Sequence, residues 1–115
     1  MNDNTANKNN SDDDTIVAVI TPPGEGGIAA LRIAGSQSLS YLQKHFQPIS
    51  KRNKNKPQPF VMRFGHFFND KKEVIDEVMA VYMPYGKSYT GLEQVEIFCH
   101  GGRQVVMLIQ DAIIQ

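Results

Sequence analysis

The strongest constraint on the fold is a Pro- and Gly-rich break between two short apolar runs near the start of the chain. Residues 15–20 are rich in β-branched side chains and almost continuously apolar, which predicts a buried central strand. Residues 21–27, with the sequence TPPGEGG, interrupt regular structure. Residues 28–33 are apolar again apart from Arg32, and Gly35 ends this second run. The ordered part of the chain is therefore expected to open with two strands.

The remaining pattern predicts two helices and further strands. Ser36 is a candidate N-cap for a short helix whose apolar residues recur at spacings of three and four, until Pro48 ends it. A basic, Asn-rich loop is expected over residues 47–59. The other expected elements are a hairpin (60–68 and 74–83, joined by 69–72), a strand at 95–99 and a helix that starts near residue 105 and runs to the end of the chain. This order predicts an α+β fold, with a mixed or antiparallel sheet of about five strands and two or three helices.

Length and composition indicate one domain of a cytoplasmic protein. Residues 1–14 are too polar to form a core and are expected to be a disordered tail, which leaves residues 15–115 as a single domain. The one cysteine, Cys99, permits no intrachain disulfide, as is usual in a reducing compartment. No apolar run approaches the ~20 residues of a membrane helix. The polar start lacks the hydrophobic segment of a secretory signal. We therefore expect no membrane partner.

Basic residues are concentrated in one half of the chain. The 12 basic and 12 acidic residues balance to a formal net charge of +0. No carboxylate occurs between Glu25 and Asp70, and this stretch carries seven basic residues: Arg32, Lys44, Lys51, Arg52, Lys54, Lys56 and Arg63. Such a segment is suited to face an anion, for example RNA phosphate.

Three motifs suggest cofactor or metal sites but lack the context that those sites require. Residues 24–29 formally fit the dinucleotide motif G-x-G-x-x-A, yet the next segment reads as a strand and no acidic residue follows before Asn69. Residues 86–88, Gly-Lys-Ser, resemble the end of a P-loop, but the position that requires glycine holds Val81. Cys99 beside His100, without further ligands at metal spacing, is weak support for zinc.

Arg32 and Glu96 are the residues that fit their surroundings least well. Each lies in an otherwise apolar run with strand character, where charged side chains are rare unless they are paired. On one interpretation each points to the solvent face of a half-exposed strand. On the other they line a pocket, in which a guanidinium and a carboxylate recognise a heterocycle with an amino-pyrimidinone edge. The pattern alone leaves both interpretations open.

A series of short motifs resembles the amino-terminal domain of the MnmE/TrmE family of tRNA-modification GTPases. The similarity extends over about residues 14–115, and the motifs occur in the family's order and spacing. They are DTIVA at 14–18, TPPGEGGIA at 21–29, LRIAG at 31–35, GH at 65–66, VIDEV at 74–78, Pro84, SYTG at 88–91, VEI at 95–97 and HGG at 100–102. Each motif is short, but matches in register over the whole chain are highly specific.

The resemblance implies a function in tRNA modification. Members of this family are GTPases that act with a flavin-dependent partner on the wobble uridine of certain tRNAs, producing the 5-carboxymethylaminomethyl modification. Their amino-terminal domain binds 5-formyl-tetrahydrofolate as one-carbon donor, forms the homodimer, and is similar in fold to half of the folate-binding region of aminomethyltransferases. The family's folate contacts map onto Arg32 and Glu96, with Tyr89, Thr90 and His100 as further candidates for the pocket lining. The basic stretch could then face the glutamate tail of the folate instead of RNA.

The resemblance also sets limits on what this chain does by itself. The family's GTPase domain, which takes GTP, Mg²⁺ and K⁺, lies outside residues 1–115, so we expect no GTP hydrolysis and no tRNA modification by this chain alone. Leu92 stands where the family usually has an acidic residue, and the basic segment from Lys51 to Lys56 is unusually long. Two alternatives remain: an RNA-binding module that uses the basic stretch, and a purely structural dimerisation module.

Overall fold

The computed structural model describes residues 15–21, 27–50, 58–86 and 91–114. The predicted tail at 1–14, most of the Pro/Gly-rich break, the basic segment at 51–56 and the candidates Tyr89 and Thr90 lie outside the described residues. Within the described part of the chain, no helix is long and apolar enough to cross a membrane.

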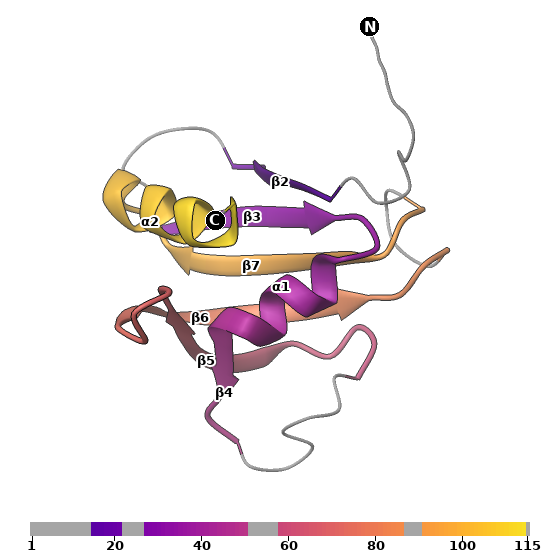
Figure 1. The fold of residues 1–115 in the computed structure, drawn as a ribbon, viewed down its shortest axis with the longest axis horizontal. Helices are drawn as coiled ribbons and strands as arrows, with labels where there is room; N and C mark the ends of the chain where they lie inside the picture. Colours follow the sequence, from indigo (N-terminus) through magenta and orange to yellow (C-terminus); the bar gives the residue numbers. More distant parts are fainter. Residues whose placement is uncertain (1–14, 22–26, 51–57, 87–90, 115) are drawn as a thin grey trace, which may run out of the picture.

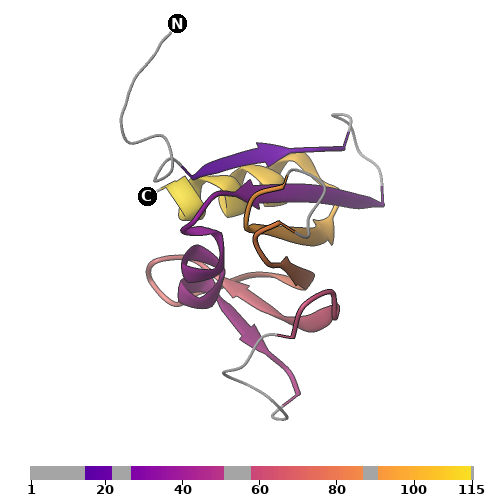
Figure 2. The same ribbon diagram turned by 90° about the vertical axis from the view of Figure 1, so that its right-hand side faces the viewer.

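The fold is a six-stranded antiparallel sheet that carries two helices, which confirms the predicted α+β class (Figure 1). The strands lie in the order β2-β3-β7-β6-β5-β4. In chain order the elements are β2 (Ile16–Val19), β3 (Ile28–Ala34), α1 (Ser38–His45), β4 (Phe46–Pro48), β5 (Arg63–Phe68), β6 (Val74–Met83), β7 (Gln94–His100) and α2 (Arg103–Ile114). Figure 2 shows the sheet twisting between its β2 and β4 edges, as expected for antiparallel strands.

The hydrophobic core lies between one face of the sheet and the two helices. Alternate residues of the central strands point into it, so that Leu31, Ile33 and Ile97 are completely buried. From α2, Ile109 packs against these strands, and Leu42 does so from α1. Both helices lie over the same face of the sheet (Figure 1). The opposite side, which we call the open face, is not covered by either helix.

Three local predictions were wrong, because the neighbours of a segment decide its structure more than its own pattern does. Residues 16–19 form an edge strand with mostly exposed side chains, and not a buried central one: Ile16 is 64% exposed. Helix α1 begins at Ser38, with Gln37 and not Ser36 as N-cap, and it ends at His45. The chain then forms β4, a strand in place of the expected loop, because Phe46 is buried in the core and its backbone pairs with β5.

The β4–β5 pairing requires glycine at position 65. Gly65 lies opposite Pro48 in the register. A Cβ at Gly65 would collide with the carbonyl oxygen of Gln47 and would lie 2.7 Å from ring atoms of Phe46. Neither the backbone nor a buried ring can move away without disturbing the sheet or the core.

We therefore predict that Gly65→Ala destabilises the fold by about 1–3 kcal/mol, the usual cost of overpacking. Urea-induced unfolding followed by circular dichroism measures this. Gly27→Ala is the matched control, because nothing lies within 4 Å of a Cβ built at Gly27. Equal stability of the two variants would contradict the close approach described above.

Candidate functional site

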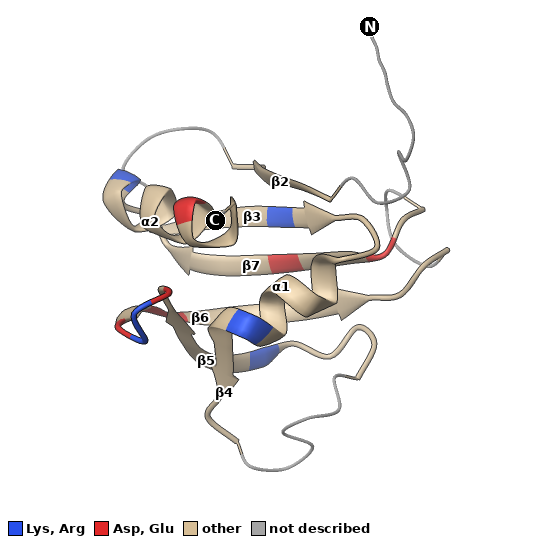
Figure 3. Ribbon diagram, in the orientation of Figure 1, with Lys and Arg blue, Asp and Glu red and all other residues tan. Residues whose placement is uncertain are grey.

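The two charged residues singled out in the sequence form an ion pair on the open face. Arg32 on β3 lies directly opposite Glu96 on β7 in the strand register. The guanidinium donates from Nε at 3.1 Å and from Nη2 at 2.8 Å, in both cases to Oε2 of Glu96. Their side chains are 24% and 14% exposed, so the pair is half-buried but reachable from solvent. Figure 3 shows the two side by side in the middle of the sheet.

Gln94 is a third member of this cluster, and sequence reasoning did not identify it. It is completely buried, two residues before Glu96 on the same strand face. Its Nε2 donates to Glu96 Oε2 at 2.9 Å and lies 3.5 Å from the sulfur of Met83. Three donors therefore converge on one carboxylate oxygen, which fixes the side chain of Glu96. Only the burial of Gln94, which no local pattern shows, would have pointed to it.

This cluster has the chemistry to recognise a flat polar heterocycle. A carboxylate accepts hydrogen bonds from an amino group and a ring N–H, and a guanidinium donates to a carbonyl or carboxylate oxygen. Because the pair is half-buried, the surroundings screen these contacts less than bulk water does. The two residues thus lie on the side of the sheet that neither helix covers, and they face each other in one cluster.

A second polar pair joins β6 to the end of β7. Nδ1 of His100 lies 2.7 Å from Oδ1 of Asp76, and the backbone N–H of His100 donates to Oδ2 at 2.9 Å. The Asp76 side chain is 12% exposed and that of His100 is 71% exposed. Since an ionised carboxylate only accepts hydrogen bonds, Nδ1 carries a proton in this contact, and Nε2 is the ring nitrogen left for a further contact.

A shallow groove of about 170 Å³ adjoins this pair. Its apolar lining comes from Ile28, Phe64, Met79 and Phe98, and its polar lining from Glu77 and His100. Ile28 and Phe64 are 63% and 50% exposed, unusually high values for large apolar side chains on a sheet. The groove is smaller than the ~300–1,000 Å³ that encloses a small molecule completely. It is suited to contact one side of a ligand.

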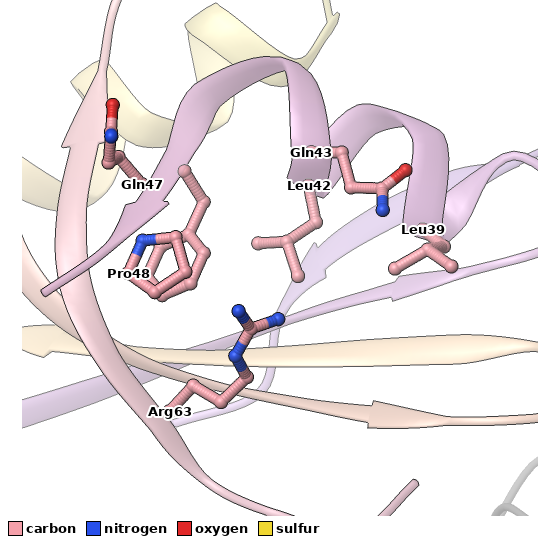
Figure 4. A pocket seen from close by; sticks show the side chains of 7 residues that line it. Leu39, Leu42, Gln43, Gln47, Pro48 and Arg63 are labelled. Atoms are coloured by element: carbon pink, nitrogen blue, oxygen red, sulfur yellow. The ribbon is translucent and has the colours of Figure 1, made fainter. Parts of the chain in front are cut away.

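A larger hollow, of about 520 Å³, lies on the other side of the sheet, between α1 and the strands β4 and β5. Figure 4 shows the guanidinium of Arg63 directed toward Leu42 there, with Pro48 and Gln47 on the left of the view. Neither Arg32 nor Glu96 lines this hollow.

Of the seven residues in the basic stretch, Lys51, Arg52, Lys54 and Lys56 lie outside the described residues, and Arg32 is paired with Glu96. The described residues therefore give no particular support to an RNA-binding surface.

Cys99 lies next to His100 but has no reactive character. Its side chain is 3% exposed. Burial, and to a smaller extent the negative charge of Asp76, raise the pKa of the thiol to about 11. Among the described residues, no group of three or more His, Cys, Asp or Glu side chains is placed to hold a metal ion.

We predict that Cys99 resists alkylation in the native protein. With its pKa raised to about 11, the thiol remains protonated at pH 8, and its burial excludes the reagent. Iodoacetamide labelling followed by mass spectrometry should give a rate at least tenfold below that of the same protein in denaturant, a margin expected from the scarcity of thiolate and the loss of access. Comparable rates in the two conditions would mean that the strand end opens readily.

Fold and site together define a class of protein: an α+β domain with a cluster of paired polar side chains on an uncovered sheet face. The family model described as "GTP-binding protein TrmE N-terminus" matches residues 15–115, and the chain belongs to this family. It is 42% identical over 102 residues to the tRNA modification GTPase MnmE of Fervidobacterium nodosum, covering 89% of this chain and 22% of that protein. The MnmE proteins of Roseiflexus castenholzii and Thermotoga maritima are each also 42% identical over 102 residues, which are 88% and 89% of this chain and 21% of each relative. The chain thus spans about a fifth of the length of these relatives.

Proposed function

We propose that this domain binds a reduced folate of the 5-formyl-tetrahydrofolate type on its open face, and that it does so as part of a tRNA-modifying GTPase. The observation that carries the proposal is the cluster of Arg32, Glu96 and Gln94, in which three donors fix one carboxylate on a face that neither helix covers. The bound folate would serve as one-carbon donor for modification of the wobble uridine of tRNA.

The residues of the open face fit the chemistry of a folate. The amino-pyrimidinone edge of a pterin presents an amino group and a ring N–H to an acceptor such as Glu96, and a carbonyl oxygen to a donor such as Arg32. Phe98 follows Glu96 at the next position on the same side of β7 and lines the apolar groove. An aromatic ring of the ligand can stack or pack edge-on against the phenyl ring of Phe98. Small-molecule sites usually combine a few polar groups, which bind the polar edge of the ligand, with an apolar groove beside them.

The ion pair would preorganise the proposed site, because it orients the side chain of Glu96 in the absence of ligand. Arg32 and Gln94 hold Glu96 in one orientation, so little side-chain entropy is lost when a ligand binds. Replacing one partner would leave the other charge half-buried and uncompensated. Loss of Arg32 therefore affects both the ligand contact and the position of Glu96.

For the whole protein we propose that it hydrolyses GTP, contacts tRNA, acts with a flavin-dependent partner and is located in the cytoplasm. Support for them comes from the family and from the name of its relatives, "tRNA modification GTPase MnmE". The matched part of each relative is about a fifth of its length. For the domain itself we propose folate binding and assembly into a homodimer.

Calorimetric titration with 5-formyl-tetrahydrofolate tests the folate proposal. We expect saturable binding by the unaltered chain, and a loss of about 1–3 kcal/mol of binding free energy in Glu96→Gln, because a carboxylate acceptor is replaced by a neutral amide. Arg32→Ala should weaken binding at least as much. Arg63→Ala is the matched control, since it removes the same side chain from the hollow that neither Arg32 nor Glu96 lines.

The thermal midpoint of each variant separates a binding role from a structural one. Equal affinities in all four proteins would exclude the cluster as the folate site. A folded chain that binds no folate at any accessible concentration would overturn the proposal itself.

Sedimentation velocity tests the proposed homodimer. Ile28 and Phe64 remain exposed on the open face, and contact with a second copy would remove such apolar surface from water. We expect a dimer at micromolar concentration, and its mass should persist at high salt because apolar burial is insensitive to ionic screening. A monomer at every concentration tested would contradict the assembly role.

A further inference from the structure

The two edges of the sheet differ in how well they are protected from pairing with a further strand. At one edge, β4 is three residues long and contains Pro48, which has no backbone N–H. The next residue, Ile49, donates its N–H inward to the carbonyl of Phe64, so the alternation along the strand directs the nitrogen of Pro48 outward. A short edge strand with a proline on its outer side is a usual protection against further pairing.

The other edge, β2, lacks this protection. Residues 15–20 read TIVAVI, without a proline and without a charged side chain. Within the described ranges of the chain, no strand lies on the outer side of β2 (Figure 1). Ile16, Val19 and Ile20 are exposed, although they are apolar. An uncharged, apolar edge strand of this kind is suited to pair with a strand of another chain.

The hydrogen bonds between β2 and β3 show which backbone groups of β2 are directed outward. The N–H of Ile20 donates to the carbonyl oxygen of Ala30 at 2.8 Å, so the backbone polar groups of Ile20 face β3. Because this orientation alternates along an antiparallel strand, those of Ala18 also face β3. Val17 and Val19 therefore direct their N–H and C=O groups outward, where a second strand can pair with them.

We infer that the strand at this edge comes from a second copy of the chain, whose β2 pairs antiparallel with β2 about a two-fold axis at Ala18. This inference rests on the proposed homodimer and names its contact. The axis sets Val17 opposite the partner's Val19, and Val19 opposite the partner's Val17. Every outward N–H of these valines then meets an outward C=O of the other copy. The contact is self-complementary, as a two-fold dimer requires.

The side chains fit this register. Opposed residues that share no hydrogen bond have their Cα atoms only about 4.5 Å apart, the closest approach of two strands. Ala18 takes this position opposite itself, and its methyl group is small enough for it. On the same face, Ile16 lies opposite the partner's Ile20, so two exposed apolar side chains cover each other. No charge in residues 15–20 opposes the contact.

The area of this contact sets the expected strength of the dimer. Stable specific interfaces bury at least about 1,200 Å² in total, and two strands of five residues meet over a length of only about 17 Å. Further apolar surface borders the edge, because the exposed Ile114 of α2 lines a hollow of about 140 Å³ together with Val17. We therefore expect dissociation in the micromolar range, at the weak end of specific interfaces.

The same register joins the open faces of the two copies. Ala18 is opposite Arg32, and Arg32 is opposite Glu96, so all three lie in one row across the sheet. With Ala18 on the axis, this row continues into the second copy. The two Arg32 residues are then three strand spacings apart, about 14 Å. Both polar clusters would lie on one continuous surface, and each would have the other copy close by.

Val19→Pro tests the backbone pairing. Proline removes an outward N–H and leaves the hydrogen bonds between β2 and β3 in place, since the N–H of Val19 does not face β3. We expect dimerisation to weaken at least tenfold in sedimentation velocity, because the N–H is lost at two symmetric positions. Val19→Thr is the matched control: it keeps the N–H and a β-branched side chain, and it should dimerise like the unaltered chain. A thermal melt verifies that each variant is folded.

Ala18→Cys tests the register directly. A Cα separation of about 4.5 Å lies within the range of about 4.4–6.8 Å that a disulfide spans. Oxidation with copper–phenanthroline should therefore crosslink this variant to a covalent dimer on a non-reducing gel. Ile28→Cys is the matched control, because Ile28 is exposed on β3 but does not lie at the axis. Cys99 is buried, and its raised pKa keeps it protonated in both variants.

The outcomes separate the contact from the dimer itself. If the dimer persists in Val19→Pro and Ala18→Cys crosslinks no faster than Ile28→Cys, the inference is wrong and the homodimer uses another surface, such as the exposed apolar side chains of the open face. A monomer of the unaltered chain at every concentration would overturn the homodimer and the inference together. Where the two tests disagree, or where Val19→Pro does not fold, the crosslinking of Ala18→Cys decides.

Discussion

The antiparallel pairing of β3 with β7 is the contact on which the rest of the structure depends. It joins residues 28–34 to residues 94–100, with paired residues 60 to 72 positions apart, and it places both strands in the interior of the sheet. On one side the pairing brings Leu31 next to Ile97 beneath the helices. On the other it brings Arg32 next to Glu96. Core and candidate site are therefore two faces of one set of backbone hydrogen bonds.

The charged pair also helps to set the register of that pairing. If β7 slipped by one residue, its side chains would exchange faces, so that Glu96 would enter the core and Ile97 would face solvent. A carboxylate buried there without its arginine is far costlier than the present half-buried pair. The same two residues that form the candidate site thus disfavour the alternative register. The proposed function and the folding specificity would then depend on one contact.

Local pattern was sufficient to predict the elements but not their neighbours. The alternation and breaks in the sequence predicted most strands, both helices and the α+β class, and the oddity of Arg32 and Glu96 was visible as charge within apolar runs. That these two residues meet was not visible, because no local rule pairs β3 with β7. For the same reason β4 was missed: its three residues, Phe46–Pro48, become a strand only when β5 lies beside them. The edge position of β2 likewise depends on which strand pairs with which.

The parts of the site that sequence reasoning missed have a common physical origin. Gln94 and Asp76 are ordinary polar residues in strand-like segments, and each matters only through a partner brought close by the fold. Gln94 is two residues from Glu96 and fixes it from the same strand face, whereas Asp76 reaches His100 from the neighbouring strand. Both hold another polar side chain in place, Glu96 and His100 respectively, without themselves being prominent on the surface. Residues of this kind determine how precisely a site is built, so the rigidity of the open face depends on them as much as on the charged pair that first drew attention to it.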